Sequence, residues 1–426
     1  MCDLKMDVQE LQFISRNLGK VTGRAVVRVD LNLPVHNGKI SSNNLRLKTC
    51  AKHLEEYVDN GIMPIIVSHQ GRRGDSDYLE SLEQHAVALE AFVDGLHVVY
   101  ANGFDGEDMR KKAEQLRQGE ALLLKNVRDH EDEKKQFSSV EELSSCGLVR
   151  ELASLANFYI NDAPATMHRN DASLVGPVYA MPSYLGLQME EELKIMQEMR
   201  NKIRMGEKTA IIFGGKKWEK FEYIYKIARH RNVRLLCGGM PGQALCYAKN
   251  KEAFNRENAE RIEKSESLET AKKLLAEFGD RITYPSDFIL DTREDIGLEG
   301  LSRAKGLAMD IGEETLNSFF EAIEGADAVI YAGPVGVYEL GYNQTLRLIT
   351  RFMGLKCDDY TLGGNSSDSM DNVGLEKAYE LLGGKRMTSG GSALAYLADE
   401  KLPVLEVFKS VAQNAKARQL SSKTNL

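Results

Sequence analysis

The segment IMPIIVSHQGRRG, residues 62–74, joins a buried-strand pattern to a polar loop and decides the fold class. Residues Ile62–Val67 are apolar and rich in β-branched side chains, which is typical of a strand buried on both faces. A helical pattern precedes this strand over Leu45–Asn60, and a second one follows it over Leu82–Leu96. A strand between two helices indicates a parallel sheet that is covered by helices.

The alternation of strand and helix extends along the whole chain. Short apolar runs recur between amphipathic stretches, and several runs end in glycine or a polar turn. This pattern favours parallel sheets with helices on both faces, so we predict an α/β fold. A length of 426 residues exceeds one typical hydrophobic core and favours two domains. The further runs that we predict as strands are Ala25–Val29, Ala121–Leu124, Asn157–Ile160, Thr209–Phe213, Val233–Leu236, Phe288–Leu290, Ala328–Tyr331 and Tyr360–Leu362.

The domain boundary is predicted near the middle of the chain. Pro182 and Gly186 interrupt the pattern there, and a charged amphipathic helix follows at Glu190–Lys202. We interpret this helix as the link between two domains. The resulting division is an N-terminal domain over residues 1–186, a second domain over residues 187–405, and a segment over residues 406–426 that returns to the N-terminal domain.

Composition and charge exclude several classes of function. The net charge of −8 argues against general affinity for nucleic acid, so any anion site requires a local cluster of Arg and Lys. No apolar run approaches the ~20 residues that span a bilayer, and the N-terminus lacks the apolar stretch of a signal peptide. The six cysteines are scattered without a CxxC pair, which is typical of reduced thiols. We therefore expect a cytoplasmic protein that binds neither nucleic acid nor membrane.

Cationic and amide side chains follow the predicted strands of the first half. A single arginine at a strand end is usually an exposed ion pair, but several arginines at one sheet edge repel one another unless an anion is present. Arginine matches carboxylate and phosphate with two parallel hydrogen bonds, so the pattern predicts a small, multiply charged anion as ligand. Asp30 has three interpretations: a turn residue, a partner for an arginine, or an acceptor for a substrate hydroxyl. His69 is either a ligand contact or a hydrogen-bonded loop residue. The side chains of this set are Arg28, Asp30, Asn32, Asn44, Arg46, His69, Gln70, Arg72, Arg73, Lys125, Arg128, His168 and Arg169.

Glycine clusters follow the predicted strands of the second half. Glycine lets backbone N–H groups approach a phosphate closely, and a helix N-terminus adds a favourable dipole. Neither GxxxxGK[ST] nor GxGxxG occurs, so the sequence predicts a nucleotide site of another kind. Lys217 is either the mobile cation for a transferring phosphoryl group or a solvated surface lysine. The clusters are Gly214-Gly215, Gly238-Gly239, Gly333 to Gly336, Gly363-Gly364 and Gly390-Gly391.

An ordered set of motifs resembles the phosphoglycerate kinase family over nearly the whole chain. HQGRRGD, LEQHA and SLVGP look like the archaeal branch. The resemblance implies two Rossmann-like parallel-sheet domains that are joined by a helix across a hinged cleft. The motifs are RVDLNLP (28–34), NNLRL (43–47), SHQGRRG (68–74), LLLKNVR (122–128), YINDAPATMHR (159–169), GGKKW (214–218), CGGM (237–240), MDIGEET (309–315), GPVGVYE (333–339), LGGNSS (362–367) and TSGGSA (388–393).

The resemblance also implies site residues and a reaction. The first domain is expected to bind 3-phosphoglycerate or the 1,3-bisphosphate through Asp30, Leu31, Asn32, Arg46, His69, Gln70, Gly71, Arg72, Arg128 and Arg169. The second is expected to bind Mg-ADP or Mg-ATP through Gly214, Gly215, Lys217, Gly238, Gly239, Glu339, Gly363, Gly364, Asn365 and Ser366, with Asn365 as a weak contact to Mg²⁺. The implied catalytic residues are Arg46, Lys217, Gly390 and Gly391. The acceptor carboxylate is already ionised, so catalysis reduces to alignment and charge neutralisation in a closing cleft.

The chain departs from the family pattern mainly on the nucleotide side. Asn365 is a weaker ligand for a hard cation than the usual Asp. Three interpretations therefore stay open: a working phosphoglycerate kinase, a paralogue that phosphorylates another carboxylic acid, or a non-catalytic binder of a phosphorylated acid. Each implies small-molecule partners and a monomer or small homo-oligomer. The departures are Lys125, Asp129, Pro164, Lys220, Phe221, Ala332, Asn365 and Ser392.

Overall fold

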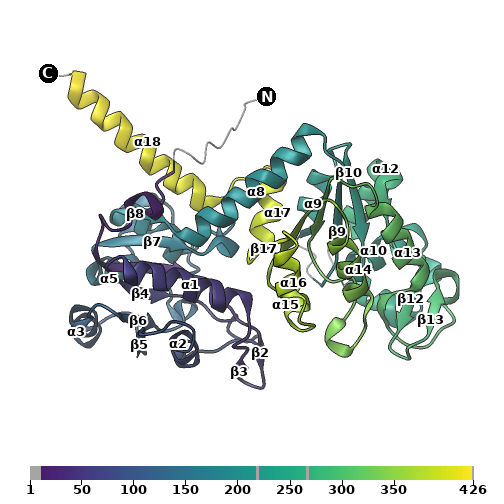
Figure 1. Ribbon diagram of the computed structural model, residues 1–426, viewed down its shortest axis with the longest axis horizontal. Helices are drawn as coiled ribbons and strands as arrows, with labels where there is room; N and C mark the ends of the chain where they lie inside the picture. The colour runs from purple at the N-terminus through teal and green to yellow at the C-terminus, as the bar shows by residue number, and fades with distance from the viewer. Residues whose placement is uncertain (1–10, 217–219, 265–267, 425–426) are drawn as a thin grey trace. The chain divides into compact units, whose positions relative to one another are not determined.

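The computed structural model describes residues 11–216, 220–264 and 268–424, with the side chains of residue 365 and residues 415–424 left out. Its contacts divide the chain into two compact units. Unit 1 comprises Met1–Lys194 and Lys401–Leu426, and unit 2 comprises Ile195–Glu400. Each unit contains its own six-stranded sheet (Figure 1). The boundaries expected after residues 186 and 405 stay predictions.

Unit 1 contains a sheet with the strand order β5-β6-β4-β1-β7-β8, in which every neighbouring pair is parallel. A short antiparallel hairpin, β2-β3, lies outside it. The strands are β1 (Gly23–Val29), β2 (Val35–His36), β3 (Lys39–Ile40), β4 (Ile62–Val67), β5 (His97–Ala101), β6 (Glu120–Leu124), β7 (Phe158–Asp162) and β8 (Ser183–Leu185). The helices are α1 (Leu45–Asp59), α2 (Glu83–Glu90), α3 (Glu107–Gln115), α4 (Val140–Ser144), α5 (Gly147–Leu155), α6 (Ala172–Val175), α7 (Pro177–Ala180) and α18 (Pro403–Thr424).

Both faces of the unit 1 sheet are buried. Alternate residues of β1, such as Val27, pack in one apolar cluster with Leu54 of α1 and Leu89 of α2. Val26 points to the opposite face and is also fully buried, and α5 contacts β1. A strand that is covered on both sides reads as a continuous apolar run, which is why the sequence revealed β1 and β4.

Unit 2 contains a second parallel sheet with the order β11-β10-β9-β15-β16-β17. Helix α8 (Leu187–Met205) begins in unit 1 and ends in unit 2. The strands of this sheet are β9 (Thr209–Phe213), β10 (Val233–Cys237), β11 (Ile282–Thr283), β15 (Ala328–Tyr331), β16 (Asp358–Leu362) and β17 (Lys385–Met387). The helices are α9 (Phe221–Ile227), α10 (Gly239–Lys249), α11 (Arg256–Glu263), α12 (Leu268–Phe278), α13 (Glu313–Ile323), α14 (Gln344–Met353), α15 (Gly364–Asp371), α16 (Glu376–Leu381) and α17 (Gly391–Leu397).

The α/β fold with two parallel sheets is confirmed, with one strand placed differently. The predicted strand Phe288–Leu290 lies in β12 (Asp287–Leu290), which pairs antiparallel with β13 (Asp295–Gly297) and β14 (Ala308–Ile311) in a separate small sheet. Apolar composition identifies a buried strand but does not give the direction of its partner. Within the described ranges, no helix is both long and apolar enough to cross a membrane.

Candidate active site

Four adjacent strands of unit 1 bring the predicted cationic loops to one edge of the sheet. The strands lie in the order β6-β4-β1-β7, and all run in the same direction. Because their carboxyl ends meet at one edge, the loops that follow them are neighbours. These loops contain the predicted acid-binding residues, and α1 adds Arg46 in its first turn.

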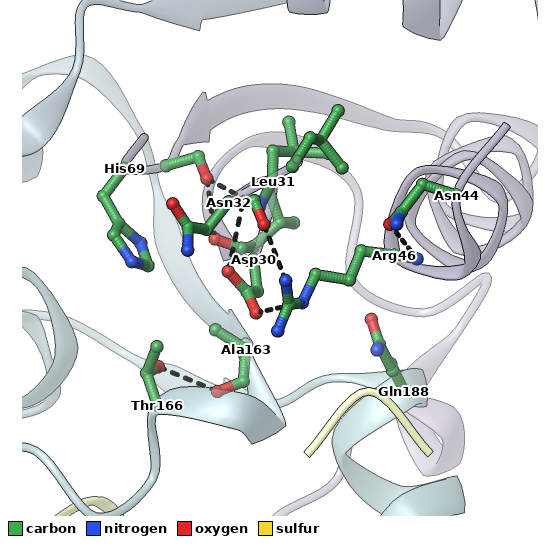
Figure 2. Close-up of polar contacts among 12 residues, drawn as sticks. Asp30, Leu31, Asn32, Asn44, Arg46, His69, Ala163, Thr166 and Gln188 are labelled. Carbon is green, nitrogen blue, oxygen red and sulfur yellow. Dashed lines mark hydrogen bonds and ion pairs between the residues drawn. The ribbon is translucent and has the colours of Figure 1, made fainter. Parts of the chain in front are cut away.

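Arg46 is held at the start of α1 by three polar contacts (Figure 2). The Asn44 carboxamide caps the helix by accepting from the Arg46 backbone N–H at 3.0 Å. The Arg46 guanidinium pairs through Nε with Asp30 Oδ2 at 3.0 Å, and its Nη1 donates to the Asn32 carbonyl at 2.6 Å. The ion pair at Nε and the hydrogen bond at Nη1 together orient the guanidinium. Of the three interpretations of Asp30, the structure supports the partner of an arginine.

The loop after β4 is fastened to the loop after β1. The Gly71 N–H donates to Asn32 Oδ1 at 2.8 Å, and the Gly71 carbonyl accepts from Arg128 Nη1. Gly71 has a φ of +62°, and a Cβ there would lie 2.4 Å from the Tyr78 Cα. Only glycine fits this position without strain. The backbone of Gly71 thus bonds to Asn32 through its N–H and to Arg128 through its carbonyl.

Two of the predicted acid-binding residues, Leu31 and Gln70, form hydrogen bonds within the protein. The Gln70 carboxamide is fully buried: its oxygen accepts from Leu33 N–H and lies 3.1 Å from His85 Nε2, and its nitrogen donates to the Leu33 and Asp77 carbonyls. The Leu31 side chain is buried, and its N–H donates to the Ser68 hydroxyl at 2.9 Å. Every hydrogen-bonding group of the Gln70 side chain has a partner. Leu31 and Gln70 therefore support the loops of the site through these bonds, and their predicted contacts with the acid stay predictions.

His69 lies between two guanidinium groups. Its Nδ1 is 3.4 Å from Arg28 Nη2, and its Nε2 is 3.4 Å from Arg169 Nη1. Burial, together with the charges of Arg28, Arg128 and Arg169, holds the pKa of the imidazole well below its usual value. His69 is therefore neutral near pH 7, and it separates two cations without adding a third.

The remaining arginines lie close enough to affect one another. Burial and the charge of Arg169 lower the pKa of Arg128 to about 10 despite the opposing effect of Asp171. The pKa of Arg169 is lowered too, mainly by burial. Arg72 is exposed, and its guanidinium makes no hydrogen bond or ion pair with the described part of the chain. This excess of positive charge indicates a site for an anion.

Arg28 belongs to the same cluster, although the family resemblance did not place it among the acid-binding residues. Its side chain is 1% exposed, and its Nη1 donates to the Val29 carbonyl. Arg28 lies inside β1, where a buried arginine interrupts an otherwise apolar run. That interruption was the signal in the sequence, because an arginine is rarely fully buried unless its charge is needed.

Backbone hydrogen bonds join the glycine-rich loops of unit 2 to one another. The Gly215 N–H donates to the Pro334 carbonyl at 2.8 Å, and the Gly239 N–H donates to the Val335 carbonyl at 2.7 Å. The Gly238 N–H donates to the Phe213 carbonyl at 2.9 Å. These three amides are therefore not free to donate to a phosphate. The predicted nucleotide contacts of Gly215, Gly238 and Gly239 stay predictions. These glycines serve the close approach of one loop to another.

Gly214 shows how tight this packing is. A Cβ on Gly214 would lie 2.1 Å from the Pro334 carbonyl oxygen. We predict that Gly214→Ala lowers the free energy of unfolding by about 2–4 kcal/mol, because two backbones must separate. Gly279→Ala is the matched control, since a Cβ there meets nothing within 4 Å. Urea unfolding of both variants checks this, and equal losses would contradict the role of close approach.

Two helix N-termini follow glycines at the carboxyl ends of β16 and β17. Gly363 has a φ of +86° and precedes α15, whose first-turn residues Gly364, Asn365 and Ser366 are the predicted phosphate contacts. The first N–H groups of a helix have no partner within it, so they suit an anion. Gly390 precedes α17, and a Cβ on Gly363 would lie 3.0 Å from the Gly390 Cα. The two loops are therefore in contact.

A lysine lies beside this pair of loops. Lys220 Nζ is 3.3 Å from the position that a Cβ on Gly390 would take. Lys217, the predicted catalytic cation, lies outside the described residues, as does the side chain of Asn365. Glu339 is exposed on a short 3-10 helix, Tyr338–Leu340. The structure thus brings Lys220, which the sequence marked only as a departure, to the predicted phosphoryl-binding loops.

A preformed metal site is missing from the described part of the chain. No group of three or more His, Cys, Asp or Glu side chains there is arranged to hold a metal ion. The described side chains of α15 offer hydroxyl groups instead, such as that of Ser366, which is 2% exposed. Neutral oxygens of this kind are weak ligands for Mg²⁺, so they would fit an ion that nucleotide phosphates hold.

An arginine cluster lies at the carboxyl ends of one parallel sheet, and glycine-preceded helix N-termini lie at the same ends of the other. These features define an α/β protein with candidate anion sites. Comparison with known proteins identifies the family. The family model described as phosphoglycerate kinase matches residues 17–400. The chain belongs to the phosphoglycerate kinase family, which places it among the phosphotransferases.

Individual relatives agree with this assignment. The phosphoglycerate kinase of Sulfurisphaera tokodaii is 32% identical, with 91% of this chain and 94% of the relative covered. That of Pyrococcus horikoshii is 30% identical over 90% and 94% of the two chains. The crystal structure of the P. horikoshii enzyme superposes with a TM-score of 0.83 and covers 95% of this chain and 99% of that one. The resemblance to the archaeal branch is confirmed.

Proposed function

We propose that this chain is a phosphoglycerate kinase that transfers a phosphoryl group reversibly between 1,3-bisphosphoglycerate and ADP, giving 3-phosphoglycerate and ATP. The observation that carries the proposal is the arginine cluster around His69, in which Arg28 and Arg169 each lie 3.4 Å from the imidazole. A cluster of this charge suits a ligand with both a phosphate and a carboxylate. Membership of the family makes that ligand a phosphoglycerate.

In this proposal the acid binds to unit 1. Arg72, Arg128 and Arg169 neutralise the phosphate group, since Arg72 has an unpaired guanidinium and the other two have lowered pKa values. Arg46 faces the transferring group with Nη2, the nitrogen that neither Asp30 nor Asn32 occupies. No general base is needed, because the carboxylate that accepts the phosphoryl group is ionised at pH 7.

The nucleotide is proposed to bind to unit 2. The N-termini of α15 and α17 bind its phosphates, and Glu339 binds the ribose hydroxyls. Lys217 and Lys220 contribute positive charge, with Lys220 Nζ already beside Gly390. Mg²⁺ bound to the nucleotide would neutralise phosphate charge, with Asn365 as the proposed contact.

We further propose a cytoplasmic enzyme that acts on small molecules as a monomer or a small homo-oligomer. The cysteines of the described residues are all unpaired, and four of the five are buried. Unpaired cysteines are typical of a reducing compartment. The negative net charge argues against nucleic acid as a partner.

A coupled assay with a panel of acids tests the proposed function. We expect ATP from ADP and 1,3-bisphosphoglycerate in the presence of Mg²⁺, and binding of 3-phosphoglycerate by calorimetry. Binding without turnover would identify a non-catalytic binder. Turnover with another acyl phosphate alone would identify a paralogue with a different acid substrate. Either result would overturn the proposal.

Lys220 provides a second test on the nucleotide side. We predict that Lys220→Ala lowers kcat about 10- to 100-fold, because Lys220 Nζ lies beside the loop proposed to contact the moving phosphoryl group. The matched control is Lys226→Ala in α9, the helix that Lys220 directly precedes; the Lys226 ammonium pairs with Glu400. Steady-state rates of both variants check this, and equal rates would contradict a role for Lys220 in transfer.

A further inference from the structure

A buried carboxyl group lies behind the arginine cluster of unit 1. Glu133 is 1% exposed and is not one of the residues proposed to contact the acid. Its carboxylate accepts from the Ser173 backbone N–H at 2.8 Å and from the Ser173 hydroxyl at 2.9 Å. The Glu133 carbonyl also accepts from the Ala172 N–H at 3.1 Å. Glu133 is therefore fastened to the start of α6 by both backbone and side chain.

Ser173 connects this carboxyl group to the arginines. The Ser173 hydroxyl accepts from Arg28 Nε at 3.0 Å while it donates to Glu133. Arg28 in turn reaches His69 with Nη2 at 3.4 Å. A continuous chain of polar contacts thus runs from Glu133 through Ser173 and Arg28 to the imidazole at the centre of the proposed acid site.

The protonation state of Glu133 depends on the charges around it. Arg28 favours the ionised carboxylate, whereas Asp171 and burial favour the neutral acid. Asp171 itself pairs with Lys134 at 2.7 Å. The charged and titratable groups that face this region from the surrounding elements are Arg28 on β1, His69 after β4, Arg128 after β6, Lys134, Tyr159 on β7, and Arg169 and Asp171 after β7.

We propose that Glu133 is a positioning residue whose protonation strengthens acid binding by the arginine cluster, so that the acid and a proton bind together. The inference rests on the proposed function, which makes the phosphorylated acid the ligand of this cluster. An ionised Glu133 competes with the acid for the charge of Arg28. A protonated Glu133 leaves that charge to the acid.

The direction of the effect follows from linkage. Burial raises the pKa of Glu133 to about 7 despite the opposing charge of Arg28. Free protein is therefore mostly protonated at Glu133 below pH 7 and mostly ionised above it. A bound anion repels the ionised form and raises the pKa of Glu133 further. Acid affinity consequently falls as pH rises through the pKa of free Glu133, and binding near pH 7 takes up part of a proton.

Glu133→Gln tests this, because glutamine keeps the size and stays neutral at every pH. Calorimetry with 3-phosphoglycerate should give dissociation constants for wild type and Glu133→Gln that agree near pH 6. Near pH 8 the variant should bind about fivefold more tightly, an effect expected for two charges that partly screened residues separate. Glu131→Gln removes the same charge from an exposed position two residues away and should match wild type at both pH values.

The comparison of dissociation constants cancels the titration of the ligand, whose phosphate has a pKa of about 6, because all proteins bind the same acid. An equal ratio of the constants at both pH values would overturn the inference and leave the proposed function intact. Absence of acid binding by wild type would overturn both. A second measurement needs no variant: wild type titrated with inorganic sulfate in a pH-stat near pH 7 should take up protons. No uptake on sulfate binding would contradict the role of Glu133.

Discussion

Arg46→Ala is expected to lower kcat/KM by about a thousandfold and to weaken binding of 3-phosphoglycerate by about tenfold or more. The substitution removes the guanidinium that faces the transferring group, and it leaves Asp30, which is 4% exposed, as an uncompensated carboxylate in the acid site. Loss of the guanidinium and exposure of the unpaired Asp30 carboxylate both weaken acid binding, because the carboxylate repels the acid that the guanidinium attracts. Steady-state kinetics and calorimetry measure the two effects separately.

Two controls make this prediction specific. Arg46→Lys keeps the charge but loses the planar fork that bonds to Asp30 and Asn32, so it should recover binding more than turnover. Lys52→Ala removes the same charge from an exposed position on α1 and should leave both quantities within about twofold of wild type. Unaltered acid binding in Arg46→Ala would count against the placement of Arg46 in the acid site.

Lys217→Ala is expected to lower kcat by about two to four orders of magnitude while leaving acid binding nearly unchanged. The reason is chemical: a lysine that neutralises the phosphoryl group acts mainly in the transition state, so its loss affects turnover rather than ground-state binding. Calorimetry with 3-phosphoglycerate and a single-turnover assay separate the two. An unchanged rate would show that Lys217 is a surface lysine.

Lys220→Ala is the informative companion to Lys217→Ala. If both lysines act on the same phosphoryl group, the double variant should lose less than the product of the two single losses. A loss equal to the product would mean that the lysines act independently. A normal rate in Lys217→Ala together with a large loss in Lys220→Ala would transfer the catalytic role to Lys220.

Much of the fold could be predicted from the sequence because both sheets are buried on both faces. Strands such as Ile62–Val67 and Thr209–Phe213 are continuous apolar runs, and the structure has them with the predicted bounds. Other elements gave weaker signals. Strand β5 (His97–Ala101) is half-exposed and begins with histidine, so the predicted helix Leu82–Leu96 was extended almost to it, whereas α2 ends at Glu90.

The candidate site, like the fold, could be predicted from the sequence only in part. Residue types at strand ends predict which side chains gather at a sheet edge, and the arginines are such a set. They do not predict which hydrogen-bonding groups the protein uses for itself. Gln70 and Gly239 match the family motifs, but both also bond within the protein. The Gln70 carboxamide donates to the Leu33 carbonyl, and the Gly239 N–H donates to the Val335 carbonyl of a neighbouring loop. The connection from Glu133 to Arg28 joins residues 105 positions apart and depends on Ser173, which no local pattern identifies.

The proposal that unit 1 binds the acid and unit 2 the nucleotide is tested most directly by a crystal structure with 3-phosphoglycerate and Mg-ADP. We predict that the acid contacts Arg72, Arg128 and Arg169, and that the nucleotide phosphates lie at the N-terminus of α15. The account is contradicted if the acid binds away from the arginines or if the phosphates lie away from that helix.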